Sequence, residues 1–238
     1  MGGQQVLGAR QLLAESLDGL PEHELPRAAC AVVAELGAPV RLRALLRELA
    51  AGDGDPEGCA RLSYRHVLGF DKLLLIDGGP RHMLRAHLWH PGKRSAAQED
   101  IHNHRSPLAS YVVSGHLGME LYEQAGGEGV AAQRYEESLA REGDWLLEPR
   151  GPARLRLIQH AEYGPGSSYA LHRNVLHRAW CTTEQPTVTL FLETGETRRA
   201  HTDVFARSPR HAPTVAKSPL AVGDYLAELA ALRDLVDG

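Results

Sequence analysis

The feature that most constrains the fold is a succession of short segments, between residues 62 and 206, in which apolar and polar residues alternate. They cover residues 72–76, 83–89, 110–114, 117–122, 144–147, 153–158, 168–171, 177–181 and 187–192. Successive side chains of a β-strand point to opposite faces, so this alternation is typical of strands. Many short strands separated by turn residues, without helical patterns between them, indicate an antiparallel sandwich or barrel.

Helical patterns flank this β-rich region on both sides. Before it, apolar residues recur at spacings of three and four in residues 6–17, 27–36 and 42–49. This spacing places them on one side of an α-helix, so we predict three amphipathic helices. After it, the same spacing predicts a C-terminal helix whose buried stripe consists of Leu226, Leu229, Leu232 and Val236.

The glycine-rich stretch 51–58 is predicted to link the first helices to the strands. We therefore expect three parts in the chain. Residues 1–55 form a helical extension packed on the β-domain, residues 62–206 form the β-domain itself, and residues 207–238 form a linker and the C-terminal helix. The predicted fold class is mainly β, with helices at both ends.

A pair of histidines carries the strongest chemical signal. His102 and His104 are two residues apart, so in a strand both imidazoles point to one face. Two imidazoles placed in this way can bind one metal ion. A third ligand must come from a distant segment. The candidates are His177, which opens a predicted strand, and His172, which lies in a more polar stretch.

The histidine pair resembles the first motif of the cupin superfamily, in which HxH is followed by a glutamate and then a glycine. His102, His104 and Gly115 match in order and spacing, but Leu108 and Ala109 occupy the two positions open to the glutamate. The resemblance is therefore to three-histidine cupins, such as the cysteine dioxygenase-like non-heme iron proteins. It covers residues 62–206 and implies a cupin-type antiparallel β-sandwich or barrel. The downstream catalytic tyrosine of that group is not found around residues 193–195.

An ion held by three neutral imidazoles keeps coordination positions for a chelating substrate and for O2. We therefore predict a mononuclear non-heme Fe(II) oxygenase or dioxygenase that acts on a small carboxylate-bearing or amino-acid-like molecule. Zn, Mn or Ni are alternative metals. With one of these, the chain would be an isomerase, epimerase or lyase without redox chemistry. A third hypothesis is a non-catalytic cupin that binds a ligand.

Three further residues are predicted to act in catalysis. Arg85 shares a strand face with His87 and Trp89, and an inward guanidinium can hold a carboxylate through two hydrogen bonds. Tyr111 can donate a phenolic hydroxyl. His172, if it is not the third ligand, is predicted to contact the ligands or the substrate.

Composition excludes several other classes. With 43% hydrophobic and 24% charged residues, the chain has the usage of a globular protein. A net charge of −4 and only three lysines argue against nucleic-acid binding. No apolar run is long enough for a membrane span or a signal peptide, and three scattered cysteines fit a reducing compartment. We therefore expect a cytoplasmic protein with a small-molecule substrate, and a homodimer is compatible with the resemblance.

Overall fold

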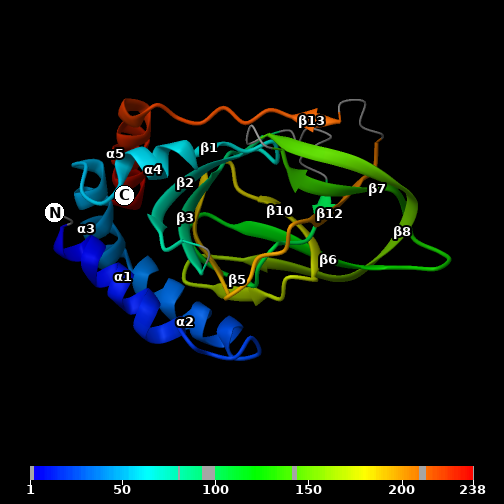
Figure 1. Cartoon of the computed structure of the whole chain (residues 1–238), viewed down its shortest axis with the longest axis horizontal. Helices are drawn as coiled ribbons and strands as arrows, with labels where there is room; N and C mark the ends of the chain where they lie inside the picture. Colours follow the sequence, from blue (N-terminus) through cyan, green and yellow to red (C-terminus); the bar gives the residue numbers. More distant parts are fainter. Residues whose placement is uncertain (1–2, 80, 93–99, 141–143, 209–212, 238) are drawn as a thin grey trace.

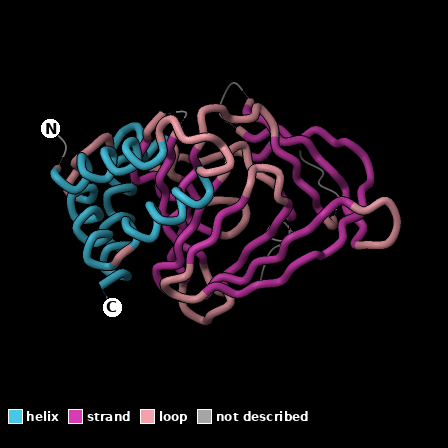
Figure 2. The backbone as a smooth tube through the Cα atoms, turned by 90° about the horizontal axis from the view of Figure 1, so that it is seen from below, coloured by secondary structure: helices cyan, strands magenta, loops and turns pink. Residues whose placement is uncertain are grey.

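The computed structural model describes residues 3–79, 81–92, 100–140, 144–208 and 213–237. Two antiparallel sheets face each other, and a layer of helices covers the outer side of one of them (Figures 1 and 2). This mainly β architecture with helices at both ends confirms the predicted fold class and is consistent with the cupin-type sandwich that the sequence resemblance implies. No helix in the described ranges is long and apolar enough to span a membrane.

The first sheet has six strands and lies next to the helices. Its order is β1 (Tyr64–Arg65), β2 (Phe70–Asp77), β3 (His82–Trp89), β11 (Thr187–Thr194), β5 (Leu108–Ser114) and β9 (Ser168–Leu171). Both of its faces are covered, and every residue of β11 is buried. Strand β11, from the last quarter of the chain, therefore lies between β3 and β5.

The second sheet has seven strands. Its order is β13 (Thr214–Val215), β8 (Trp145–Tyr163), β6 (Leu117–Gln124), β10 (Leu176–Cys181), β4 (Ile101–His102), β12 (Thr202–Ala206) and β7 (Val130–Leu139). The long strand β8 pairs with β6 through its second half and with β7 through its first half. The sheet therefore curls back on itself and encloses space on its inner side.

Five helices complete the fold in the part of the chain that the structure describes. They are α1 (Gln4–Leu17), α2 (Leu25–Gly37), α3 (Pro39–Ala50), α4 (Pro56–Arg61) and α5 (Val222–Asp237). Helix α2 packs on β5, β9 and β11, while α5 packs on α3. The predicted stripe of the first helix is confirmed, because Val6, Ala9, Leu13 and Leu17 are all buried. Burial of such stripes, rather than helix propensity, holds short helices in place.

Strand β3 connects the helical layer to the interior of the sandwich. Leu84 and Ala86 belong to the apolar core shared with the helices, whereas Arg85 and His87 line a cavity on the other face. This is the alternation that the sequence predicts for residues 83–89. One face of β3 thus packs in the apolar core, and the other presents polar side chains to the cavity.

Two sequence predictions are wrong in detail. The stretch 51–58 is only partly a linker, since Asp55 caps helix α4 by accepting a hydrogen bond from the backbone of Gly58 at 2.9 Å. Segments 144–147 and 153–158 belong to one strand, β8, which pairs with β7 across a local shift in register. Strands β7 and β12 were not predicted, because charged residues weaken their alternation.

Gly115 occupies the turn between β5 and β6, as its place in the motif suggests. Its φ angle is +72°, a conformation that favours glycine. A Cβ at this position would also collide with the side chain and backbone of Thr187. The hydroxyl of Thr187 accepts a hydrogen bond from the backbone N–H of His116, which ties this turn to the start of β11.

Candidate metal centre

Three imidazoles from separate segments converge on the inner side of the second sheet. His102 in β4 is the register partner of His177 in β10, and His104 follows two residues after His102. The nearest ring nitrogens of the three lie within 4.8 Å of one another. The structure therefore brings together the three residues predicted as metal ligands, and their binding of a metal stays a prediction.

The spacing of the ring nitrogens fits shared ligation. The Nε2 atoms of His104 and His177 are 3.3 Å apart. Two nitrogens bound at about 2.1 Å to one tetrahedral ion would be about 3.4 Å apart. The observed separation of this pair is therefore compatible with a common ion.

The other nitrogen of each ring has an acceptor. Nδ1 of His177 donates to the carbonyl of Val175 at 3.1 Å, and Nδ1 of His102 faces the carbonyl of Asp100 at 3.5 Å. Nδ1 of His104 lies 3.5 Å from a carboxylate oxygen of Glu193. An acceptor at Nδ1 keeps the proton there, which leaves the Nε2 lone pair for a metal. All three Nε2 atoms are therefore prepared as ligands.

Burial favours the neutral form of these rings. It lowers the pKa of His102 to about 3, with a smaller contribution from His104. Burial, followed by the two neighbouring histidines, also holds the pKa of His177 well below its usual value. Neutral imidazole is the form that binds a metal, so the donor set fits the ion that the resemblance implies.

Glu193 connects the histidines to two arginines. One of its carboxylate oxygens lies 2.7 Å from Nη2 of Arg85 and 3.2 Å from Nη2 of Arg198. Burial opposes the charge on Glu193, but the ion pair with Arg85 and the contact with His104 outweigh it and hold the pKa of the carboxyl well below its usual range. Glu193 therefore stays ionised in the interior and fixes the ring of His104.

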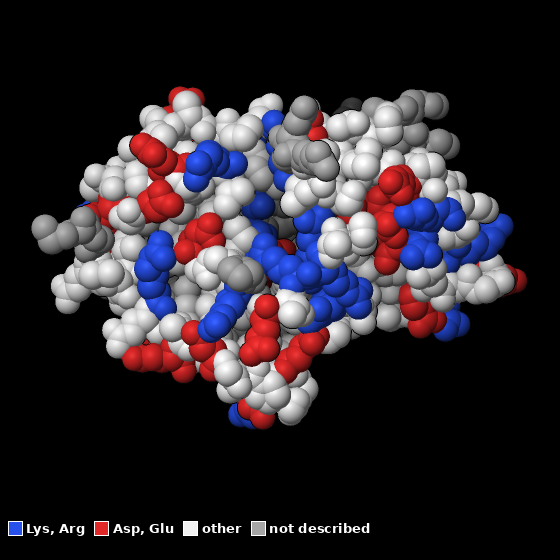
Figure 3. Space-filling model, in the orientation of Figure 1, with Lys and Arg blue, Asp and Glu red and all other residues white. Residues whose placement is uncertain are grey.

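A cavity of about 550 Å³, lined by residues of both sheets, lies beside His102 and His104. His102 and His104 form part of its wall, together with Glu193 and the aromatic rings of Phe70 and Phe191. Its volume is within the range of small-molecule sites, which are typically concave and largely apolar with a few placed polar groups. Near its centre, the face shown in Figure 3 is hollowed, and lysine and arginine side chains gather beside the hollow.

His87 is a buried polar group without a partner. It is 4% exposed, and neither ring nitrogen has a hydrogen-bond partner among the described residues. Its ring packs between Phe70 and Phe191, with centroids 4.5 and 4.6 Å away. Burial, and then the cation of Arg85, holds the pKa of His87 well below its usual value. A neutral imidazole thus lines the cavity at a cost in stability.

Replacing His87 by phenylalanine should therefore raise the stability of the metal-free protein. An unsatisfied buried polar group costs about 1–3 kcal/mol, and a rise of about 1 kcal/mol would increase Tm by roughly 2–4 °C in a chain of this size. Thermal unfolding followed by circular dichroism measures this rise.

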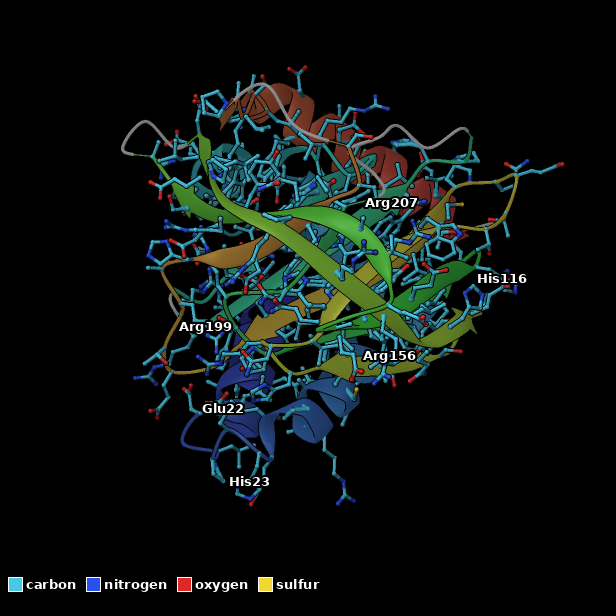
Figure 4. The ribbon with its side chains drawn as sticks, turned by 90° about the vertical axis from the view of Figure 1, so that its right-hand side faces the viewer. Glu22, His23, His116, Arg156, Arg199 and Arg207 are labelled. Atoms are coloured by element: carbon cyan, nitrogen blue, oxygen red, sulfur yellow. The ribbon has the colours of Figure 1, made fainter. Side chains whose placement is uncertain are left out.

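His116→Phe is the matched control because His116 is exposed on a turn (Figure 4). Its substitution should change stability by less than about 0.5 kcal/mol. A lower Tm for His87→Phe than for the parent would show that the imidazole has a stabilising partner.

The structure places the other predicted catalytic residues in different surroundings. Arg85 lines the cavity, but its guanidinium binds Glu193, a residue of its own chain. Tyr111 faces helix α2, where its ring would meet any side chain at Gly37, and it does not line the cavity. His172 is half-exposed and lies 3.1 Å from Glu22, in the loop between α1 and α2 (Figure 4). Neither Tyr111 nor His172 enters the proposals below.

Sequence reasoning missed two features of the site. The role of Glu193 was not predicted, although a carboxylate in an otherwise apolar strand is itself a signal, because such residues are seldom buried without a partner. The cavity also contains Lys72 and Lys217, two of the three lysines in the chain. Because lysine is so rare in this sequence, these two residues could have been proposed as site residues from the sequence.

No protein-family model matches this sequence, and no curated protein does. Solved structures with a similar fold exist. The oxalate decarboxylase of Bacillus subtilis is 13% identical with a TM-score of 0.34, over 60% of this chain and 29% of that chain. KdgF from Halomonas sp. is 14% identical with a TM-score of 0.32, over 54% of this chain and 81% of that chain.

The Drosophila melanogaster CENP-C cupin domain is 15% identical with a TM-score of 0.36, over 68% of this chain and 98% of that chain. The match to the oxalate decarboxylase spans under a third of that chain. These likenesses are distant, and the function proposed below is derived from the chain's own residues. The finer resemblance to cysteine dioxygenase-like proteins stays a prediction.

Proposed function

We propose that this protein is a metal-dependent enzyme that binds one Fe(II) through His102, His104 and His177 and oxidises a small carboxylate-bearing molecule with O2. The observation that carries the proposal is the arrangement of three neutral imidazoles, each with its Nδ1 directed to an acceptor and its Nε2 left for the ion. An Fe(II) ion held by these three residues would supply open coordination positions and redox chemistry toward O2.

The residues around the histidines support an anionic substrate. Three neutral ligands leave the charge of a divalent ion uncompensated, so a carboxylate is favoured as a further ligand. Glu193 is held by Arg85 and Arg198 and is not itself directed at the Nε2 atoms. Its function in this proposal is to orient His104 and to keep the proton on Nδ1 of that ring.

The cavity supplies the remaining conditions for the reaction. Phe70, His87 and Phe191 form an aromatic wall that excludes bulk water from the substrate. His87 is neutral and its ring nitrogens have no hydrogen-bond partner among the described residues, so it adds an uncharged ring to this wall. Positioning of the substrate by such groups supplies part of the rate enhancement.

The test is O2 consumption by the protein after removal of metal and anaerobic reconstitution with Fe(II). Small carboxylates and amino acids are added in air while an oxygen electrode records uptake. We expect substrate-dependent uptake that requires Fe(II) and is lost in His104→Ala but kept in His116→Ala, an exposed histidine outside the cavity.

The same experiment distinguishes the oxygenase from a lyase or isomerase, which three neutral ligands also allow. If a substrate is converted equally fast without oxygen, or with Zn(II) in place of Fe(II), the oxygenase proposal fails and a lyase or isomerase is favoured.

A further inference from the structure

Two cations share one aromatic ring at the cavity wall. The guanidinium carbon of Arg105 lies 5.1 Å from the centroid of the Trp145 ring, and Nζ of Lys217 lies 3.7 Å from the same centroid. All three residues line the cavity. Arg105 follows His104 directly in the chain, so this cationic pair lies on the metal side of the cavity rather than at a remote surface.

Arg105 has hydrogen-bonding capacity that the protein does not use. Its Nε and Nη2 atoms are buried and have no hydrogen-bond partner among the described residues. No carboxylate among those residues lies within 4.0 Å of the side-chain nitrogens of Arg105 or Lys217. Burial, and then the neighbouring cation of Arg105, lowers the pKa of Lys217 to about 8.

The acidic residues nearby are engaged elsewhere. Glu137 accepts a hydrogen bond from the hydroxyl of Thr202 at 3.1 Å, and burial raises its pKa. Asp144 accepts from the backbone N–H of Lys217 at 3.1 Å. The positive charge of the pair is therefore not neutralised by an ion pair within the described part of the protein.

Partly buried cations that lack an anionic partner cost free energy, and two neighbouring cations add repulsion. An oxyanion in the cavity that contacts both residues would offset both costs, because a guanidinium can bind two oxygens and an ammonium one. We infer that Arg105 and Lys217, backed by the ring of Trp145, form an anion subsite for a carboxylate or phosphate group of the substrate.

This subsite narrows the substrate class if the proposed function holds. A molecule that uses one oxygen-donor group at the metal would place a second anionic group against Arg105 and Lys217. The inferred substrate is therefore a small molecule with two acidic ends. The anion subsite itself does not depend on the metal, so it is tested without one.

The experiment uses full-length protein freed of metal by a chelator. Isothermal titration calorimetry measures the binding of succinate, propionate and inorganic phosphate to the parent, to Arg105→Gln and to Lys217→Gln. Charge-assisted hydrogen bonds contribute enough that each substitution should weaken binding of the preferred anion by about tenfold or more. Arg156→Gln is the control, because Arg156 is exposed and lies outside the cavity (Figure 4).

Comparison of the probes identifies the source of the anion. A preference for the carboxylates supports a carboxylate group on the substrate, and a preference for phosphate supports a phosphate group. In protein reloaded with metal, succinate should bind more tightly than propionate, and both cavity substitutions should remove this difference.

The inference is overturned if the folded parent binds none of the probes at millimolar concentration, or if both cavity variants bind like the parent while circular dichroism shows them folded. These outcomes are separate from failure of the proposed function. Loss of O2 consumption with intact anion binding would refute the oxygenase and leave the subsite in place.

Discussion

Replacing His177 by alanine should abolish stoichiometric metal binding, whereas replacing His172 should leave it intact. In the proposed centre His177 supplies one of three ligands, and its Nε2 lies 3.3 Å from that of His104. His172 is half-exposed, pairs with Glu22 and is not part of the histidine cluster. Metal analysis after loading and gel filtration should give one ion per chain for the parent and for His172→Ala, and close to none for His177→Ala.

These two histidines make a matched pair because the sequence left both open as the third ligand. Circular dichroism spectra of the two variants show whether a lost metal reflects a lost fold. Full metal content in a folded His177→Ala protein would contradict the proposed centre, and loss of metal in His172→Ala would mean that the ligand set is different.

Replacing Glu193 by glutamine should lower both stability and metal affinity. Glu193 is 7% exposed, and its carboxylate forms ion pairs with Arg85 and Arg198 and lies against His104. Removal of one partner from a buried ion pair costs about 3–5 kcal/mol, which corresponds to a fall in Tm of roughly 10 °C for a chain of this size. Loss of the acceptor at His104 should weaken metal binding by about 10–100-fold. Thermal unfolding of the metal-free protein and metal titration measure the two effects separately.

Glu123→Gln is the control, because Glu123 also pairs with an arginine, Arg156, but at the surface. Exposed ion pairs contribute about 0–1 kcal/mol, so its Tm should change little. An unchanged Tm in Glu193→Gln would show that Arg85 and Arg198 do not depend on this carboxylate. A fall in Tm with unchanged metal affinity would assign Glu193 to stability alone.

Much of the fold followed from the sequence because periodicity reflects burial. The stripe at Val6, Ala9, Leu13 and Leu17 predicted a helix that the structure contains, and the alternation of residues 83–89 predicted which side chains of β3 point to the cavity. Each of these patterns is local. A local pattern can be read without knowing which element lies opposite.

The parts that could not be predicted depend on contacts between distant residues. Arg85 was expected to hold a substrate carboxylate, but the structure pairs it with Glu193, its diagonal neighbour on the adjacent strand. The ion pair between Arg85 and Glu193 can be predicted only when the register of β3 and β11 is known. Strand β7 was missed for a similar reason, since its charged residues pair with arginines on neighbouring strands, as Glu136 does with Arg150. Hydrophobic periodicity does not record such pairs.

The position of β4 also has a consequence for the order of events during synthesis of the chain. This short strand carries His102, and its two neighbours in the sheet are β10 and β12, both of which are translated much later. A ribosome-bound chain that ends before residue 176 therefore has neither neighbour of β4 and lacks His177. Domains fold as their segments emerge, so in the proposed centre all three imidazoles can bind one ion only after β10 has been translated. Acquisition of metal by a nascent chain would accordingly report that β10 has been added.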